Sequence, residues 1–373
     1  MTINKVSNLG SRKLEFHILQ SFPPTCLNRD DVGSPKSAIV GGSLRARVSS
    51  QCWKRQIRQS MHELSNSETA GIRTKRLDHL CKEFFTDGIP EDLSKKLLQE
   101  TLIFISEKEA EAIKKYVSEN LAKLKTKEEE KKFWQNFWHE SLSASGIDAE
   151  DIALFGRMVA RAPEMDIEAA ASFSHAISTH RVESEIDFFT AMDDLSADDK
   201  QGASHLGVKE FNSAVYYRYI SLNIDQLKNN LKGIEISSTI ERFIKALYVA
   251  VPIACQTTLS GASPWGFARI LLRRGQRIQV PFDTAVWAKT SESYLGKSIE
   301  NLQEELEHYR SQSGSLFQAD GDWTLGGNKD NKDSINKTGS TQVNNIDELI
   351  NQIQGEIEQE NSSIERSEEN GDC

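Results

Sequence analysis

The chain has 373 residues, of which 38% are hydrophobic, and a formal net charge of −10, so it is long enough for two or three domains with a sizeable core. Its first residues lack the apolar stretch of a secretion signal, and the longest apolar run, residues 246–255, is too short to span a bilayer. The five cysteines form no CxxC pair, which argues against a zinc knuckle or a disulfide framework and leads us to expect a cytoplasmic protein without membrane contact.

The first predicted element is a strand that leads directly into a basic segment. Leu14, Phe16 and Ile18 alternate with polar residues, as they would in a strand. Residues 28–58 then carry seven cationic side chains against two acidic ones, a local net charge of +5 inside an acidic chain. The basic segment is therefore compatible with binding to a nucleic acid.

Within the basic segment we expect a tight turn, a short strand and a helix. The Gly41-Gly42 pair favours the positive φ angles of a turn. The alternation after it predicts a half-buried strand whose arginines, Arg45 and Arg47, both leave the core face. The Ser49-Ser50 pair is the expected helix cap. Helical spacing predicts the buried side of this helix, which consists of Trp53, Ile57 and Met61.

The start of this helix suits a row of phosphates. A helix N-terminus presents unpaired N–H groups and a partial positive charge to an anion. Lys54 and Arg58 lie one turn apart and, with Arg55 beside them, would extend that attraction along the helix. The same spacing is equally compatible with a solvated basic helix face, and a nucleotide-binding loop of the Walker type is absent from the sequence.

The middle of the chain is predicted to be mainly helical. Apolar residues recur at three- and four-residue steps over residues 61–149. An aromatic ridge in this region is interpreted as ordinary core rather than as a base-stacking surface. It consists of Phe133, Trp134, Phe137 and Trp138. A strand is then predicted over residues 151–158 and a helix over residues 169–179.

The last third begins with two extended arms around a polar turn, the pattern of a protruding hairpin over residues 182–211. A helix is predicted over residues 231–251 and a strand over residues 268–272. Residues beyond Phe317 are too polar to bury a core and are expected to remain disordered. One late amphipathic helix is the exception, predicted from Ile346, Leu349, Ile350 and Ile353. The last nineteen residues carry a net charge of −6.

Catalytic chemistry finds little support in the residues. A metal site could be assembled from His175, His180 and His205 with the Asp193-Asp194 pair, but a five-residue separation puts two side chains on different helix faces. The sequence lacks the nucleophile motif G-x-S-x-G. We therefore expect a mixed α/β protein, without metal or cofactor, that binds a phosphate backbone without reading bases.

Several motifs, in one order, resemble a known family. The similarity is carried by CLNRDD at residues 26–31, by the glycine, arginine and serine pattern of residues 41–58, and by DIALFGRM, HAISTH and SHLG between residues 151 and 211. These motifs look like those of the crRNA-binding backbone subunit of the type I-E CRISPR Cascade complex. The resemblance covers most of the chain outside the helical insertion and the acidic end.

The resemblance implies an α+β fold with an RRM-like (ferredoxin-like) palm, a helical fingers insertion and a protruding thumb β-hairpin. The implied segments are the palm at residues 13–60, 150–181 and 212–317, the fingers at residues 61–149, the thumb at residues 182–211, and a polar acidic tail with one possible helix at residues 318–373. The first palm segment contains the basic loop and the RNA-gripping helix. The tail looks longer than is usual for the family.

The resemblance also implies a non-catalytic scaffold. Such proteins oligomerise along CRISPR RNA, bind its phosphate backbone and present segmented guide bases for pairing with target DNA in antiviral defence. The expected partners are crRNA, target DNA through the guide, other copies of the chain and other Cascade subunits. The alternative is a metal-dependent ribonuclease, acting on CRISPR or target RNA, that uses the histidines and the Asp193-Asp194 pair.

Ten residues match RNA-contacting positions of the family. Those in the basic loop are Asn28, Arg29 and Lys36. Those on the helix are Ser49, Gln51, Lys54, Arg55 and Arg58. Met165 and Leu206 match apolar side chains that wedge at a kinked nucleotide. Cys255 stands where the family commonly has a lysine, which puts a backbone contact at that position in doubt.

Overall fold

A computed structural model of the chain describes residues 10–65, 70–82, 95, 98–121, 126–142, 147–159, 162–191, 205–231, 234–327 and 338–369. The chain forms two compact units. The first comprises Met1–Arg12, Arg58–Ser172 and Leu222–Ala246, and the second comprises Lys13–Ile57, Phe173–Ser221 and Leu247–Cys373. The chain passes from one unit to the other within α1 (Ser50–Leu64), β6 (Ala171–Phe173), β9 (His205–Asn223) and α8 (Ile236–Val249).

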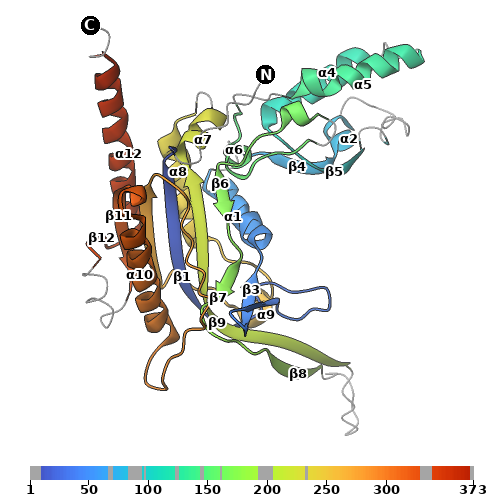
Figure 1. Ribbon diagram of the computed structural model, residues 1–373. Coiled ribbons are helices and arrows are strands. Elements are labelled where there is room, and N and C mark those ends of the chain that lie inside the picture. Colours follow the sequence, from blue (N-terminus) through green and yellow to red (C-terminus); the bar gives the residue numbers. More distant parts are fainter. Residues whose placement is uncertain are drawn as a thin grey trace. The chain divides into compact units, whose positions relative to one another are not determined.

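The second unit is built on one large sheet (Figure 1). Its strand order is β12-β11-β10-β1-β9-β7-β3-β2. The strands not yet given are β1 (Lys13–Thr25), β2 (Ser37–Val40), β3 (Ser43–Val48), β7 (Ala176–Ser178), β10 (Phe267–Arg273), β11 (Ala319–Gly326) and β12 (Thr341–Val343). Most neighbours are antiparallel, and Lys13 of β1 lies opposite Arg273 of β10. The predicted first strand and the strand at residues 268–272 are confirmed.

Both faces of β1 are buried, which the alternation of its residues did not predict. Leu14, Phe16 and Ile18 are buried, and so are the polar Glu15 and His17 between them. A buried charge needs a partner, and Glu15 has Arg273, whose Nη1 lies 3.1 Å from its Oε1. The central strand thus holds a polar network as well as a hydrophobic core.

Helix α10 (Tyr294–Ser313) packs its apolar side on the sheet. Leu302 and Ile299 join Leu19, Tyr217 and Phe267 in one buried cluster. The 3-10 helix η3 (Gly314–Phe317) follows α10, α9 (Gln256–Leu259) packs against β1, and α12 (Ile346–Glu369) packs against β11 and β12. The late amphipathic helix is therefore confirmed and is longer than the pattern predicted.

The expectation of disorder beyond Phe317 was wrong at β11. Trp323 and Leu325 are buried, and Asp322 binds the buried Arg269 of β10 at 3.0 and 2.7 Å. A polar strand can be ordered when its carboxylate neutralises a cation inside the core. The partner of Asp322 lies 53 residues earlier, so no local pattern could reveal it.

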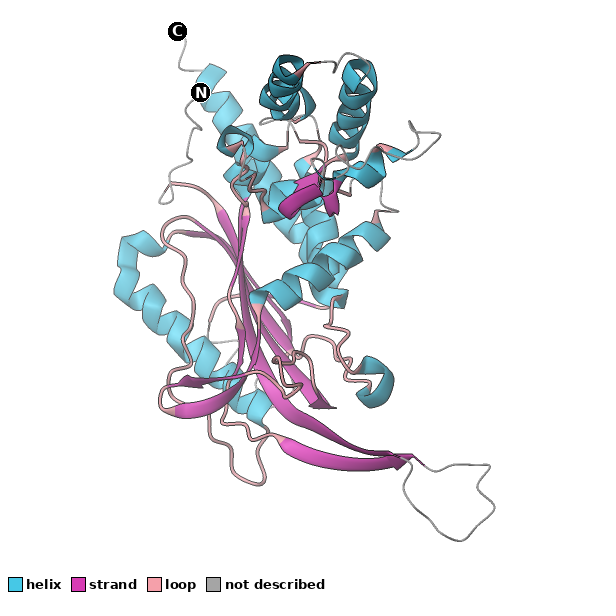
Figure 2. Cartoon of the chain, turned by 90° about the vertical axis from the view of Figure 1, so that its right-hand side faces the viewer, coloured by secondary structure: helices cyan, strands magenta, loops and turns pink. Residues whose placement is uncertain are grey.

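The protruding hairpin is confirmed. β8 (Glu185–Ala191) pairs antiparallel with β9, from Glu185 opposite Phe211 to Ala191 opposite His205. The two strands run beyond the rest of the sheet (Figure 2). Their outer part exposes large apolar side chains, namely Ile186, Phe188, Phe189 and Val208.

The first unit is largely helical, as expected for residues 61–149. Besides parts of α1 and α8, its helices among the described residues are α2 (Leu77–Leu80), α4 (Glu107–Leu121), α5 (Lys127–Ser141), α6 (Glu150–Phe155), η2 (Pro163–Met165) and α7 (Ile224–Asn230). Phe133, Phe137 and Trp138 are buried in one cluster, which confirms the interpretation of the aromatic ridge as core. The sequence did not predict the two-stranded sheet of β4 (Ile72–Arg76) and β5 (Leu98–Ile105).

Two secondary-structure assignments in the middle of the chain were wrong. Residues 151–158 begin as helix α6 rather than as a strand, with Glu150 and Asp151 in the first turn, where carboxylates favour a helix. Residues 169–179 form β6 and β7 rather than a helix, because β7 is held between β3 and β9. In such short segments distant pairing overrides local propensity.

The fold is thus mixed α+β with a large sheet, as expected, while the ferredoxin-like detail stays a prediction. None of the helices in the described residues has the length and apolarity needed to cross a bilayer.

Candidate nucleic-acid interface

The turn predicted at Gly41 and Gly42 joins β2 to β3. Their φ angles are 54° and 73°, in the left-handed region that glycine tolerates. A Cβ on Gly41 would lie only 1.5 Å from the carbonyl oxygen of Asp283, so the position also excludes a side chain for lack of space. The turn sets the register in which Val40 lies opposite Ser43.

Arg45 does not leave the core face, contrary to the prediction. Its side chain is buried, and its guanidinium donates to the carbonyl oxygens of Ser178 at 2.8 Å and Phe282 at 3.1 Å. Burial lowers the pKa of Arg45. The guanidinium group thus connects β3 to β7 and to the segment around Phe282. Arg47 is half-buried, and its Nε donates to the Ser37 carbonyl at 3.3 Å.

Hydrogen bonds from an aspartate side chain and from the backbone close the basic loop before β2. Asp30 Oδ1 accepts the N–H groups of Val32 at 3.0 Å and Ser34 at 2.9 Å. Lys36 N donates to the Asn28 carbonyl at 2.9 Å, and Lys36 O accepts the Arg47 N–H at 2.8 Å. This closed loop holds Lys36 at the edge of the sheet.

Side chains from three segments cap the start of α1. Asn28 Oδ1 accepts the Ser49 N–H at 3.0 Å, and Ser49 Oγ accepts the Cys52 N–H at 3.3 Å, which confirms Ser49 as a cap. His175 Nδ1 accepts the Ser50 N–H at 3.3 Å. Three of the first N–H groups are therefore already satisfied by the protein. The attraction for an anion must come mainly from side chains, not from bare helix amides as the sequence suggested.

Cationic side chains surround this helix start. Burial is the main cause that lowers the pKa of His175, and the positive charges of Arg47 and Lys36 lower it further. Burial raises the pKa of the Cys52 thiol, while Arg55 and Lys36 oppose that rise. Lys36, Arg47 and Arg55 are thus near enough to the helix start to act on neighbouring groups. We call these three residues, with Arg29 and Lys54, the basic cluster.

The members of the basic cluster differ in exposure. Arg29 and Arg55 are exposed, whereas Lys54 is half-buried with its Nζ 5.3 Å from the centre of the Phe173 ring. Gln51 is also exposed, one turn before Arg55. These side chains can reach phosphates along the outer side of α1.

A further arginine, which the sequence did not single out, lies beneath α1. Arg218 of β9 is buried, with its Cζ 3.7 Å from the ring centre of Trp53, and it donates to Gln20 at 2.8 Å. Burial lowers its pKa to about 9, so it remains charged at neutral pH. This charge adds to the positive potential under the helix.

Arg58 belongs to the first unit and has protein partners there. Its Nε lies 3.1 Å from Asp151 Oδ2, and its guanidinium lies 5.1 Å from the Phe104 ring centre. His62 Nε2 lies 2.6 Å from the same carboxylate oxygen. The structure therefore gives Arg58 a packing and charge-pairing role, and its contact with RNA stays a prediction.

The two expected wedge residues differ in what the structure describes. Met165 is buried, with 5% of its surface exposed, in the core cluster of the first unit. A side chain in that position packs a core, and its contact with a nucleotide stays a prediction. Leu206 pairs with Thr190 across the hairpin, but its side chain lies outside the described residues.

Two of the histidines considered for a metal site, His175 and His180, have other partners, and the side chain of His205 lies outside the described residues. His180 Nε2 accepts the Val215 N–H at 3.2 Å, and its ring stacks on Tyr294 at 4.1 Å. The Asp193-Asp194 pair lies outside the described residues. Within the described parts of the chain, histidine, cysteine and carboxylate side chains form no group of three that could hold a metal ion.

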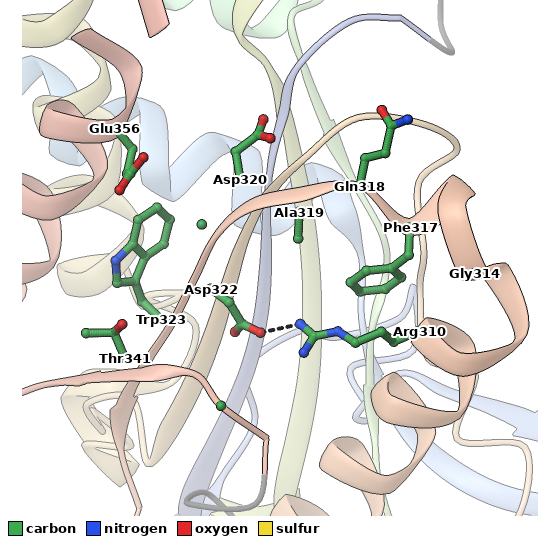
Figure 3. Close-up of a pocket in the computed structure, with 12 residues that line it drawn as sticks. Arg310, Gly314, Phe317, Gln318, Ala319, Asp320, Asp322, Trp323, Thr341 and Glu356 are labelled. Atoms are coloured by element: carbon green, nitrogen blue, oxygen red, sulfur yellow. Dashed lines mark hydrogen bonds and ion pairs between the residues drawn. The ribbon is translucent and has the colours of Figure 1, made fainter. Parts of the chain in front are cut away.

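A pocket of about 500 Å³ opens elsewhere in the second unit, at β11, the end of α10 and α12 (Figure 3). Its charged lining consists of Asp320, Asp322, Glu356 and Arg310, and Arg310 forms an ion pair with Asp322. Carboxylates dominate this lining. The pocket is therefore a poor site for phosphate, in contrast to the basic cluster.

Comparison with known proteins places this fold. The sequence matches the family described as CT1975-like protein over residues 14–352. A chain of a CRISPR RNA-guided surveillance complex, pre-nicking, superposes with a TM-score of 0.74 at 23% identity and covers 91% of this chain and 99% of that chain. A chain of a CRISPR RNA-guided surveillance complex gives a TM-score of 0.62 at 21% identity, with the same coverage. No curated protein matches the sequence. The chain has the fold of these subunits and belongs to the CT1975-like protein family.

Proposed function

We propose that this protein is a Cascade-type CRISPR subunit, of the type I-E backbone kind, that coats CRISPR RNA without cutting it. Several copies would assemble on one RNA, bind its phosphates and present guide bases for pairing with target DNA. Its partners would be crRNA, further copies of the chain and other subunits of the complex, in the cytoplasm. The family match and the likeness to chains of RNA-guided surveillance complexes support this role.

The observation that carries the proposal is the basic cluster at the start of α1. Lys36 and Arg55 both act on Cys52, and Arg47 acts on His175, so cations from a loop, a strand and a helix meet at one place. An exposed arginine such as Arg55 binds phosphate without reading a base. In a chain of net charge −10, such a concentration of cations is best explained by a polyanionic ligand.

The hairpin supports assembly between copies. Ile186 and Phe188 on β8 and Val208 on β9 are 57, 66 and 58% exposed. Val208 lies directly opposite Phe188 in the register, so the three side chains form one apolar face. Exposed apolar surface of this kind marks an interaction site, and a neighbouring copy on the same RNA is the proposed occupant.

The deciding experiment is size-exclusion chromatography with light scattering on the purified chain, alone and with RNAs of increasing length. We expect the mass to grow in steps with RNA length while the RNA stays intact. Growth should be similar for unrelated RNA sequences, because the phosphates are bound and the bases are not read. Indifference to RNA would overturn the proposal, and shortening of the RNA that requires a divalent metal would favour the ribonuclease alternative.

A further inference from the structure

Two cysteines meet where the basic loop leaves the sheet. Cys26 directly follows β1, and Cys255 directly precedes α9, which packs against β1. Cys26 is buried and Cys255 is half-buried. Cys255 lies near enough to Cys26 to raise its pKa. They lie 229 positions apart in the sequence, so their proximity is a product of the fold.

The segment that carries Cys255 is held firmly against the end of β1. A Cβ on Gly261 would lie 2.2 Å from the Oγ1 of Thr25, the neighbour of Cys26. The Cys255 carbonyl accepts the N–H groups of Thr258 at 3.1 Å and Leu259 at 2.8 Å. These contacts hold the segment that carries Cys255 against the end of β1, next to Cys26 in the sequence.

Cys255 also has an uncommon backbone conformation. Its φ is 58°, in the left-handed region that residues other than glycine rarely adopt. Such conformations cost free energy and cluster at functional sites.

We propose that Cys26 and Cys255 form a redox-active pair that closes to an intramolecular disulfide when a low-molecular-weight disulfide is present. The more exposed Cys255 thiolate attacks one sulfur of the small disulfide and releases one thiolate, which leaves a mixed disulfide on Cys255. Cys26 then loses its proton to water, and its thiolate attacks the Cys255 sulfur and displaces the second thiolate. Two electrons pass from the cysteine pair to the small disulfide, which departs as two thiols.

The second step should depend strongly on pH. Burial and then Cys255 raise the pKa of Cys26 to about 11, while Arg29 and Lys209 oppose that rise. Burial, and then the charge of Cys26, raise the pKa of Tyr216. Only the thiolate reacts. Closure of the mixed disulfide should therefore accelerate about tenfold per pH unit between pH 7 and pH 9, as the thiolate fraction rises.

Closure would fix the start of the basic loop to α9. Arg29 lies three residues after Cys26, and Lys209 of β9 also donates to Thr258 in the segment after Cys255. Any effect of closure on RNA rests on the proposed function. The cross-link itself does not, because it is detected without RNA.

The experiment incubates the folded, RNA-free protein with glutathione disulfide, blocks free thiols with N-ethylmaleimide and maps peptides without reduction. We expect one peptide pair that joins Cys26 to Cys255 and disappears after dithiothreitol. Cys255→Ser should abolish it, whereas Cys373→Ser should leave it unchanged. Circular dichroism confirms that each variant is folded.

Three results would overturn the proposal. Cys255 could retain the small thiol as a stable mixed disulfide, the cross-link could join other cysteines, or the pair could stay reduced in a large excess of glutathione disulfide. Because RNA is absent, these results leave the scaffold role untouched. Conversely, a protein that ignores RNA but forms the Cys26–Cys255 bond contradicts only the scaffold role.

Discussion

The side-chain oxygen of Asn28 accepts the backbone N–H of Ser49 at 3.0 Å, across 21 residues of sequence. Through this bond the basic loop holds the first turn of α1, and Ser49 in turn caps Cys52 at 3.3 Å. Loop and helix therefore act as one support for the basic cluster. Asn28 contributes to that support whether or not it also contacts RNA.

Replacing Asn28 by alanine should lower the free energy of unfolding by about 1 kcal/mol, because the Ser49 N–H loses its acceptor. Asn28→Asp keeps the accepting oxygen and should lose much less. Urea denaturation followed by circular dichroism measures both variants. An equal loss in the two would show that the hydrogen bond is not the cause.

Replacing Arg55 by alanine should weaken RNA binding to a similar extent for unrelated sequences. Removal of one phosphate contact should reduce the slope of log affinity against log salt by about 0.7 for single-stranded RNA. Fluorescence anisotropy at several salt concentrations measures the slope. Lys289→Ala is the matched control, since Lys289 is exposed and lies outside the basic cluster. A loss confined to one RNA sequence would contradict backbone recognition.

Arg58→Ala should destabilise the protein even without RNA. The variant leaves the buried Asp151 carboxylate without one of its donors, which should cost about 1–3 kcal/mol in the free energy of unfolding. In an Asp151→Asn background the same change should cost less. Thermal and urea unfolding of the wild type, the two single variants and the double variant give the coupling free energy between Arg58 and Asp151. Unchanged stability together with weaker RNA binding would instead assign Arg58 to the interface.

Acid should weaken the fold through His17. Burial, followed by the charges of Arg269 and Arg273, lowers the pKa of His17 to about 3. The unfolded chain binds this proton near pH 6.5 and the folded chain does not, so stability falls as pH drops below about 6.5, by up to about 1.4 kcal/mol per pH unit. The raised pKa of Glu15 has the opposite effect on stability as the pH falls. This effect is present in a His17 variant as well as in the wild type.

A His17→Gln variant isolates this contribution. The wild type should lose more stability than the variant as the pH falls from 6.5 towards 4, measured by urea unfolding at each pH. Parallel pH curves would show that His17 does not titrate as its burial implies.

Phe188→Ser should reduce assembly on RNA without affecting the monomer. Phe188 is 66% exposed, so its loss should change the free energy of unfolding by no more than about 0.5 kcal/mol. Asp187→Ser is the control, because neighbouring residues of a strand point to opposite faces. Light scattering of the RNA complexes should show smaller masses for the Phe188 variant alone. Equal masses would remove the apolar face from the assembly proposal.

Local sequence patterns were sufficient to predict those elements whose structure is determined by their own residues. Gly41 and Gly42 predicted the β2–β3 turn, and the apolar spacing of Trp53 and Ile57 predicted the buried side of α1. β11 and β7 were missed because their order depends on strands far away in the sequence. The same limit applies to any short polar strand whose partner is distant.

The sequence likewise showed where the cationic residues lie along the chain, but it did not show which residues they contact in the fold. Arg45 bonds to Phe282, 237 residues later, and Arg58 bonds to Asp151, 93 residues later. These contacts decide that one arginine is buried and the other is paired. Arg55 has no hydrogen bond or ion pair of this kind among the described residues. Its predicted contact with phosphate therefore rests mainly on its exposure.

The position of β1 between β9 and β10 has a consequence for synthesis. Lys13 lies opposite Arg273, so the central strand of the second unit cannot be paired on both sides until residue 273 has been made. At ~5–20 residues per second, roughly 13–50 s separate the two strands on the ribosome. During that interval the apolar side chains of β1 have only part of their cover. Newly made chains should therefore depend on chaperones that bind exposed apolar strands before the sheet closes.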